Sequence, residues 1–172
     1  MDPKKLAAPA GLPAASVWFR SVEEFGSSQQ AERPAVLVSA CLLGVACTHL
    51  GESRSNPAVL ALRSEARLIP VCPEVAGGLA TPRPRAERGR DGRVLTSEGA
   101  DVTALYEKGA EQAVVLARAT GARRAVLKAR SPSCGSREIY DGSHAGVLIA
   151  GEGVTASALR GASVLVVSDE DL

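Results

Sequence analysis

The sequence has 172 residues, which suits one domain with a sizeable core and leaves little room for a second. Its 20 basic and 19 acidic residues give a formal net charge of +1, so no broad electrostatic field favours nucleic acid or an anionic membrane. Aromatic residues make up only 3%, which leaves few stacking platforms for single-stranded nucleic acid, and no apolar run reaches the roughly 18 residues of a membrane span.

Residues 1–33 are rich in Ala, Pro and Ser, and we separate them as an N-terminal extension from a single α/β domain at residues 34–172. Apolar side chains near helical spacing predict a short helix in this extension, at Val17, Trp18, Val22 and Phe25. A disordered tail is the alternative that the composition allows. The extension has no continuous apolar segment of signal-peptide type, so we expect a cytoplasmic protein.

Patterns typical of strands and helices alternate through the rest of the chain. Short apolar runs predict strands at 35–40, 67–72, 124–128 and 163–167, and capping residues with apolar periodicity predict helices at 56–67, 101–120 and 154–160. The segment 73–101 is dense in Gly, Pro and Arg and predicts a long functional loop with a small hairpin at Asp91-Gly92. We therefore predict the α/β class, as a three-layer Rossmann-like fold with a short, mainly parallel sheet of about four strands and an N-terminal helical extension.

Three of the four cysteines fall at the carboxyl ends of predicted strands. Cys41 follows the first strand, Cys72 ends the second, and Cys134 lies six residues beyond the third. Because these ends share one edge of a parallel sheet, we expect the three thiols to converge there. Three thiolates leave one metal position open, which suits a catalytic iron–sulfur cluster better than a structural site. For any one of them alone, buried packing is the alternative.

Polar residues near these cysteines are candidates for chemistry. Glu74 lies two residues after Cys72 and is a candidate catalytic base, and Ser131 and Ser133 stand beside Cys134 as candidate positioning and substrate-binding donors. The guanidinium groups of the run Thr81-Pro82-Arg83-Pro84-Arg85 suit an anionic or carbonyl-bearing ligand, and Arg83 is the candidate substrate-binding residue of this run. A solvated carboxylate, turn-forming serines and a stiff surface loop are the structural alternatives.

The fourth cysteine and the two histidines have less definite predictions. Cys47 lies six residues after Cys41. It could serve as a spare ligand, as a sulfur acceptor or in packing, and we favour packing or an auxiliary role. His49 and His144 fall in predicted loops, where exposed side chains are the simplest interpretation. A zinc site that combines one of them with cysteines stays open, although no C-x-x-C or H-x-x-x-H spacing supports it.

Six segments are distinctive when they occur together: SACLLGVAC, GESRSN, VCPEVAGGLATPRPRAE, GADVT, LKARSPSCGSREIYDG and GEGVTA. With them the sequence resembles the bacterial domain-of-unknown-function 523 family, whose characterised member is a thiouracil desulfidase. The resemblance covers roughly residues 35–172. The sequence departs from the family pattern after Cys47, where Thr48-His49-Leu50-Gly51 stands in place of Arg-Tyr-Asp-Gly.

The resemblance implies an iron–sulfur-dependent desulfidase that acts on a small thiolated pyrimidine such as 2-thiouracil. It implies a 4Fe-4S cluster held by Cys41, Cys72 and Cys134, with one iron that the protein leaves free to bind the thione sulfur. Glu74 would act as proton shuttle or water activator, and Ser131 would help to position substrate or water. Attack of water at the C=S carbon would release the oxo-pyrimidine and leave hydrosulfide on the cluster, without net electron transfer.

A small thiolated base or nucleoside is therefore the partner that we expect, rather than nucleic acid or a membrane, and a homodimer is left open. The chain stops at Leu172, without the further domain that some relatives carry for thiolated transfer RNA, and this also favours a small substrate. Two other hypotheses stay open. One is a zinc or small-molecule binding module with structural cysteines, and the other is a sulfur carrier that uses Cys47 or Cys134 as nucleophile.

Overall fold

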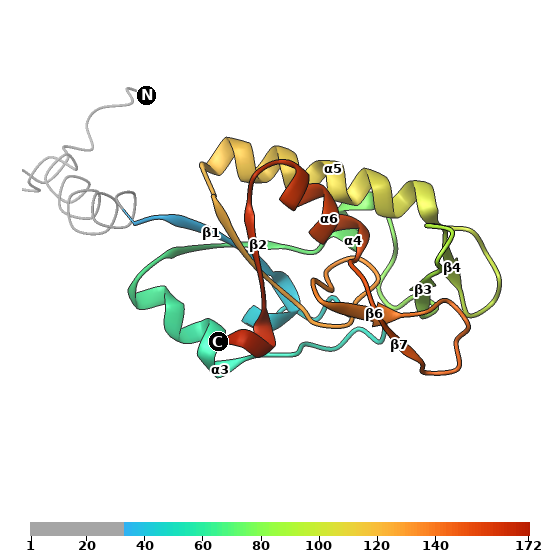
Figure 1. Ribbon diagram of the computed structural model, residues 1–172. Coiled ribbons are helices and arrows are strands. Elements are labelled where there is room, and N and C mark those ends of the chain that lie inside the picture. Colours follow the sequence, from blue (N-terminus) through green and yellow to red (C-terminus); the bar gives the residue numbers. More distant parts are fainter. Residues whose placement is uncertain (1–32) are drawn as a thin grey trace, which may run out of the picture. The chain divides into compact units, whose positions relative to one another are not determined.

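A parallel four-stranded sheet forms the centre of the computed structural model, which describes residues 33–172 (Figure 1). The strands stand in the order β2-β1-β5-β8, with all neighbouring pairs parallel. Their bounds are β1 Ala35–Ser39, β2 Arg67–Val71, β5 Arg124–Leu127 and β8 Leu165–Ser168. The predicted parallel sheet of about four strands is therefore confirmed. The helix predicted around Trp18 lies outside the described residues, and the boundary at residue 34 stays a prediction.

Helices cover both faces of this sheet. These helices are α3 (Pro57–Ala61), α5 (Thr103–Thr120) and α6 (Val154–Gly161). Side chains of β1 alternate between the two faces. Leu37 packs in one buried cluster with Ala113 of α5 and Leu159 of α6, whereas Val38 packs in another with Val59 of α3. Figure 1 shows α5 and α6 on one side of the sheet and α3 on the other. The three-layer α/β prediction is confirmed.

Local sequence signals account for the bounds of the helices. The side chain of Asn56 accepts hydrogen bonds from the backbone N–H groups of Ala58 and Val59, so it caps α3 as predicted. Helix α3 is shorter than the pattern indicated and continues as a 3-10 turn, η2, over Leu62–Ser64. Helix α5 ends where Gly121 takes a left-handed φ of 69°, as predicted. In the part of the chain that the structure describes, none of the helices combines the length and apolar character that a membrane span requires.

The segment 73–101 is more regular than its composition predicted. It forms a short helix, α4, over Pro73–Gly77, and a hairpin of β3 (Ala86–Arg88) and β4 (Val94–Thr96). The hairpin around Asp91-Gly92 is confirmed, but the prediction of a loop was wrong for α4. A proline at the first helical position and a left-handed Gly78 at the end bound this helix, and packing on α5 stabilises it.

A second small hairpin follows β5 in a segment that the sequence left as a connection. Its strands are β6 (Glu138–Tyr140) and β7 (Leu148–Ala150), which pair antiparallel. Two further 3-10 turns extend sheet strands at their carboxyl ends: η1 (Ala40–Leu43) continues β1, and η3 (Asp169–Asp171) continues β8. The β6–β7 hairpin, η1 and η3 therefore all follow carboxyl ends of sheet strands.

Candidate active site

A cavity of about 360 Å³ lies at the carboxyl edge of the sheet. Cys41 lies in η1, two residues after the end of β1, Cys72 directly follows β2, and Cys134 lies in the loop after β5. Strand β1 is hydrogen-bonded to both β2 and β5, so the three cysteines come from three adjacent strands. All three line the cavity, and Cys47 lines it as well. The edge shared by the strands thus brings together residues that are far apart in the sequence.

Burial controls the ionisation of the cavity thiols. Burial, with a smaller contribution from the neighbouring Cys72, raises the pKa of Cys41 to about 11, although the charge of Lys128 opposes this shift. Burial and the neighbouring Cys72 likewise raise the pKa of Cys47 to about 12. Burial also raises the pKa of Cys134, against a hydrogen bond with Ser39 that lowers it. Without a bound metal, these buried thiols are therefore protonated at neutral pH.

Glu74 extends from α4 into the same cavity. Its Oε2 accepts from Arg83 Nε at 2.8 Å and lies 2.7 Å from Arg83 Nη2. Its Oε1 has a longer contact, 3.5 Å from the Ser131 hydroxyl. Tyr106 of α5 also lines the cavity, and a hydrogen bond with Glu74 contributes to the raised pKa of this tyrosine, after burial and the charge of Glu74. Arg83 therefore fixes Oε2 of Glu74 in an ion pair, whereas Ser131 lies at a longer distance from Oε1.

Ser131 and Ser133 have different surroundings. Ser131 lines the cavity, and its Oγ accepts from the backbone N–H groups of Ser133 and Cys134, both at 3.1 Å. The Ser133 side chain is fully buried, outside the cavity lining, and its hydroxyl lies 2.9 Å from that of Thr155. The structure thus places Ser131 beside Glu74, but directs Ser133 into the interior.

Arg83 lines the cavity but is almost entirely enclosed. All three nitrogens of its guanidinium group contact oxygen atoms of this chain, in a set formed by Glu74, Ala80, Thr81 and Cys47. Only 5% of its side chain is exposed. Burial lowers the pKa of Arg83, but the charge of Glu74 and their hydrogen bond raise it overall, so the ion pair is maintained. Its donors are committed to the protein, which sequence reasoning did not anticipate.

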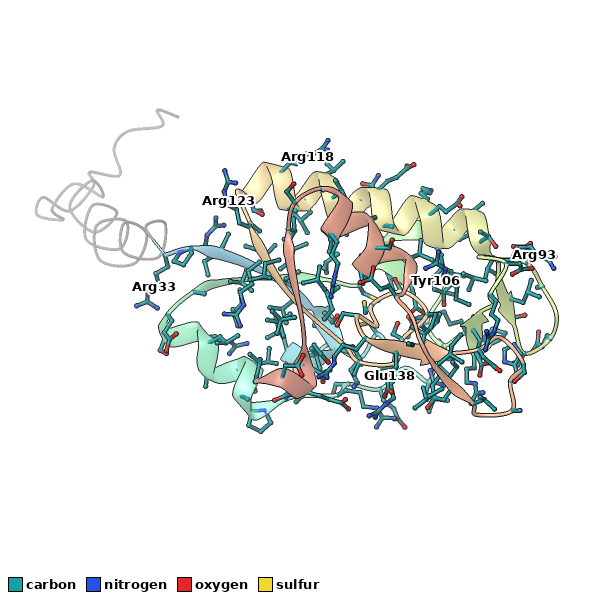
Figure 2. The ribbon with its side chains drawn as sticks, viewed as in Figure 1. Arg33, Arg93, Tyr106, Arg118, Arg123 and Glu138 are labelled. Atoms are coloured by element: carbon teal, nitrogen blue, oxygen red, sulfur yellow. The ribbon has the colours of Figure 1, made fainter. Side chains whose placement is uncertain are left out.

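Sequence reasoning also missed Ser39, Tyr106 and Tyr140 of the cavity wall, whereas it had included Arg85 with Arg83 in one candidate ligand-binding run. Tyr106 falls at helical spacing with buried alanines of α5, which is the pattern of an ordinary core residue. Figure 2 shows it directed from α5 toward the interior. Ser39 carried a usable signal, because it is the last residue of β1 and therefore at the edge where ligands bind.

Known proteins are similar to this chain in sequence, and one of them also in its solved structure. The family model described as 2-thiouracil desulfurase matches residues 36–171. The Uncharacterized protein YbbK of Bacillus subtilis (strain 168) is 38% identical over 146 residues, which are 80% of this chain and 97% of YbbK. A solved structure of the [4Fe-4S]-dependent thiouracil desulfidase TudS, of the DUF523 type, is 47% identical, with a TM-score of 0.76 over 81% of this chain and 93% of TudS. These matches confirm the resemblance that the motifs indicated, and the chain is an enzyme that belongs to the 2-thiouracil desulfurase family.

Proposed function

We propose that this chain is an iron–sulfur-dependent desulfidase that converts a small thiolated pyrimidine, such as 2-thiouracil, into the oxo-pyrimidine. Water is the second substrate, and the products are the pyrimidine carbonyl and hydrogen sulfide. The C=S bond is replaced by C=O without net electron transfer, so neither an oxidant nor a reductant is needed. The convergence of Cys41, Cys72 and Cys134 on one cavity with Glu74 carries the proposal.

The three cysteines fit a 4Fe-4S cluster as a donor set. Within residues 33–172, no three His, Cys, Asp or Glu side chains are grouped closely enough to hold a single metal ion. Cluster ligands differ from that arrangement, because each cysteine binds a different iron. The charges of Lys128 and Arg83 lower the pKa values of Cys41 and Cys47, respectively, so cations are available to offset thiolate charge when the thiols release their protons to metal.

When bound, the cluster would supply a Lewis-acidic iron, not ligated by protein, that polarises the thiocarbonyl and accepts its sulfur. Glu74 Oε1 is the atom that we assign to proton transfer, because Arg83 engages Oε2. It would accept a proton from the attacking water and pass it to the departing sulfur. Ser131 holds Oε1 through its hydroxyl and orients the loop of Cys134 through its Oγ, so it serves as a positioning residue.

Anaerobic reconstitution with iron and sulfide tests this proposal. The purified chain is loaded without oxygen, its iron and sulfide contents are measured, and 2-thiouracil is added while released sulfide and uracil are quantified. We expect a brown protein with four irons per chain that forms sulfide and uracil in equal amounts. Ala in place of Cys41, Cys72 or Cys134 should remove cluster and activity together.

Cys47→Ala is the matched control, because Cys47 is also a buried cysteine of this cavity. We expect this variant to retain its iron and most of its turnover. Glu74→Gln should keep the cluster but lose about 10²–10⁴-fold in kcat, the range for general acid–base groups. A colourless protein with stoichiometric zinc and no reconstitution would instead support the module with structural cysteines.

A further inference from the structure

Two arginines of the same Pro-rich run have opposite environments. The side chain of Arg83 is 5% exposed and its nitrogens are all engaged, whereas that of Arg85 is 43% exposed. Both arginines line the cavity. Within residues 33–172, the only hydrogen bond donated by the Arg85 side chain goes from Nη2 to Glu87. Arg85 therefore has donors left for a ligand, and Arg83 does not.

The position of Arg85 is fixed by a buried carboxylate. The Glu87 side chain is fully buried, and its Oε1 binds Arg85. Its Oε2 accepts from the backbone N–H groups of Gly142, at 3.2 Å, and His144, at 2.9 Å. A buried charge persists only when it is paired and hydrogen-bonded in this way. Glu87 thus joins β3 to the connection between β6 and β7.

The strand that leads into this connection, β6, carries an aromatic ring next to Arg85. The guanidinium carbon of Arg85 lies 5.5 Å from the ring centroid of Tyr140, at the end of β6, and Tyr140 also lines the cavity. This is the range of a cation–π contact, which orients a guanidinium group against an aromatic face. Glu87 and Tyr140 therefore hold Arg85 from two sides while part of it remains accessible.

We propose that Arg85 and Tyr140 form the substrate-recognition wall of the cavity, with Arg85 donating a hydrogen bond to a ring carbonyl oxygen of the thiolated pyrimidine. The inference rests on the proposed desulfidase function. A planar guanidinium group with free N–H donors suits a carbonyl oxygen in the plane of a heterocycle, and the adjoining aromatic ring suits its apolar face. Arg85 is thus a specificity residue, and Arg83 a positioning residue that acts through Glu74.

A pair of substrates isolates the carbonyl contact. 2-Thiouracil and pyrimidine-2-thione carry the same thiocarbonyl group, but only 2-thiouracil has a carbonyl at C4. For Arg85→Ala, we expect kcat/KM to fall about tenfold or more with 2-thiouracil and much less with pyrimidine-2-thione, because a charged donor to the carbonyl is lost. Tyr140→Ala should lower kcat/KM for both substrates, because stacking does not depend on the carbonyl, and should lower it further for 2-thiouracil, because Tyr140 also orients Arg85.

Two controls separate recognition from damage to the fold. Arg93 lies in the turn of the β3–β4 hairpin, pairs with Asp91 and is 60% exposed (Figure 2), so Arg93→Ala should leave kcat/KM unchanged for both substrates. Arg85→Lys keeps a cation beside Glu87 and should fold normally, yet it should still lose preference for 2-thiouracil. Iron content and circular dichroism verify that each variant is folded and loaded.

The outcomes distinguish this inference from the proposed function. Failure of the wild-type protein to release sulfide would overturn the desulfidase, and equilibrium dialysis with uracil would still test whether Arg85→Ala weakens binding about tenfold. Equal losses with both substrates in folded Arg85→Lys, or unchanged uracil binding in Arg85→Ala, would overturn the role of Arg85. A selective loss with 2-thiouracil supports it.

Discussion

Gly77 of α4 and Gly109 of α5 meet in a helix contact that leaves no room for a side chain on either residue. A Cβ on Gly77 would lie 2.0 Å from the carbonyl oxygen of Leu105, and one on Gly109 would lie 2.0 Å from that of Pro73. Helix α4 begins directly after Cys72 and carries Glu74, and α5 carries Tyr106. The contact between the two glycines therefore determines how closely the groups of α4 approach those of α5.

We expect Gly109→Ala to push α4 away from α5 and to disturb both Cys72 and Glu74. The clash involves backbone atoms, so the loss of unfolding free energy should be at least about 1–3 kcal/mol, and iron content after reconstitution should fall. Gly161→Ala is the matched control, because Gly161 also lies in a helix but a Cβ there would meet nothing within 4 Å. It should stabilise the protein by about 0.5–1 kcal/mol. Denaturant unfolding and iron analysis measure both effects, and equal stability of the two variants would contradict the role of the glycine contact.

Arg83→Ala should lower kcat rather than raise KM. Arg83 holds Glu74 Oε2 and also donates to the carbonyl oxygen of Cys47, so its removal frees the carboxylate to turn away from its working position. We expect a loss of about tenfold or more in kcat with a nearly unchanged KM for 2-thiouracil. Arg83→Lys should recover part of the loss, because a lysine restores the positive charge but cannot form the paired hydrogen bonds of a guanidinium group.

A double-mutant cycle with Glu74→Gln shows whether Arg83 acts through that carboxylate. If it does, adding Arg83→Ala to Glu74→Gln costs little further kcat. Multiplicative losses in kcat, or a large rise in KM for Arg83→Ala alone, would instead restore the prediction that Arg83 binds substrate directly.

Ser133 should affect stability and not substrate affinity. Its hydroxyl and that of Thr155 are both fully buried and 2.9 Å apart, so Thr155→Val leaves a buried polar group without its partner. We expect Thr155→Val to cost about 1–3 kcal/mol of unfolding free energy, and the added Ser133→Ala change to return much of it. Urea unfolding measures the cycle. A clear rise in KM for Ser133→Ala would favour the substrate-binding role that the sequence predicted.

The metal-free protein should lose stability in alkaline solution. The pKa of Cys41 is raised from 9.0 to about 11, mainly by burial, so the thiol loses its proton in the unfolded chain before it does so in the folded one. The stability that this thiol contributes is fully present below pH 9 and is lost as the pH rises toward about 11. The midpoint of guanidinium unfolding, measured with reduced protein from pH 8 to 11, should fall more steeply for the wild type than for Cys41→Ala. Parallel pH curves for the two proteins would contradict this assignment.

The sequence by itself determined the parts of this protein that depend on neighbours in the chain. The short apolar runs predicted four strands, and Asn56 and Gly121 marked helix ends, because capping involves residues only a few positions away. It also placed Cys41, Cys72 and Cys134 at strand ends, from which their common edge followed once the strands were taken as parallel. The motifs around these cysteines were sufficient to indicate the family.

Tertiary structure decided which side chains face the cavity and which do not. Arg83 and Arg85 look equivalent in the sequence, but an ion pair to Glu74 encloses one, and the buried Glu87 holds the other partly exposed. Ser133 turns inward because Thr155, 22 positions away, supplies its hydrogen bond. Side-chain direction at such positions depends on partners from distant segments, whose approach is set by packing contacts such as that between Gly77 and Gly109. A local pattern carries no information about those partners.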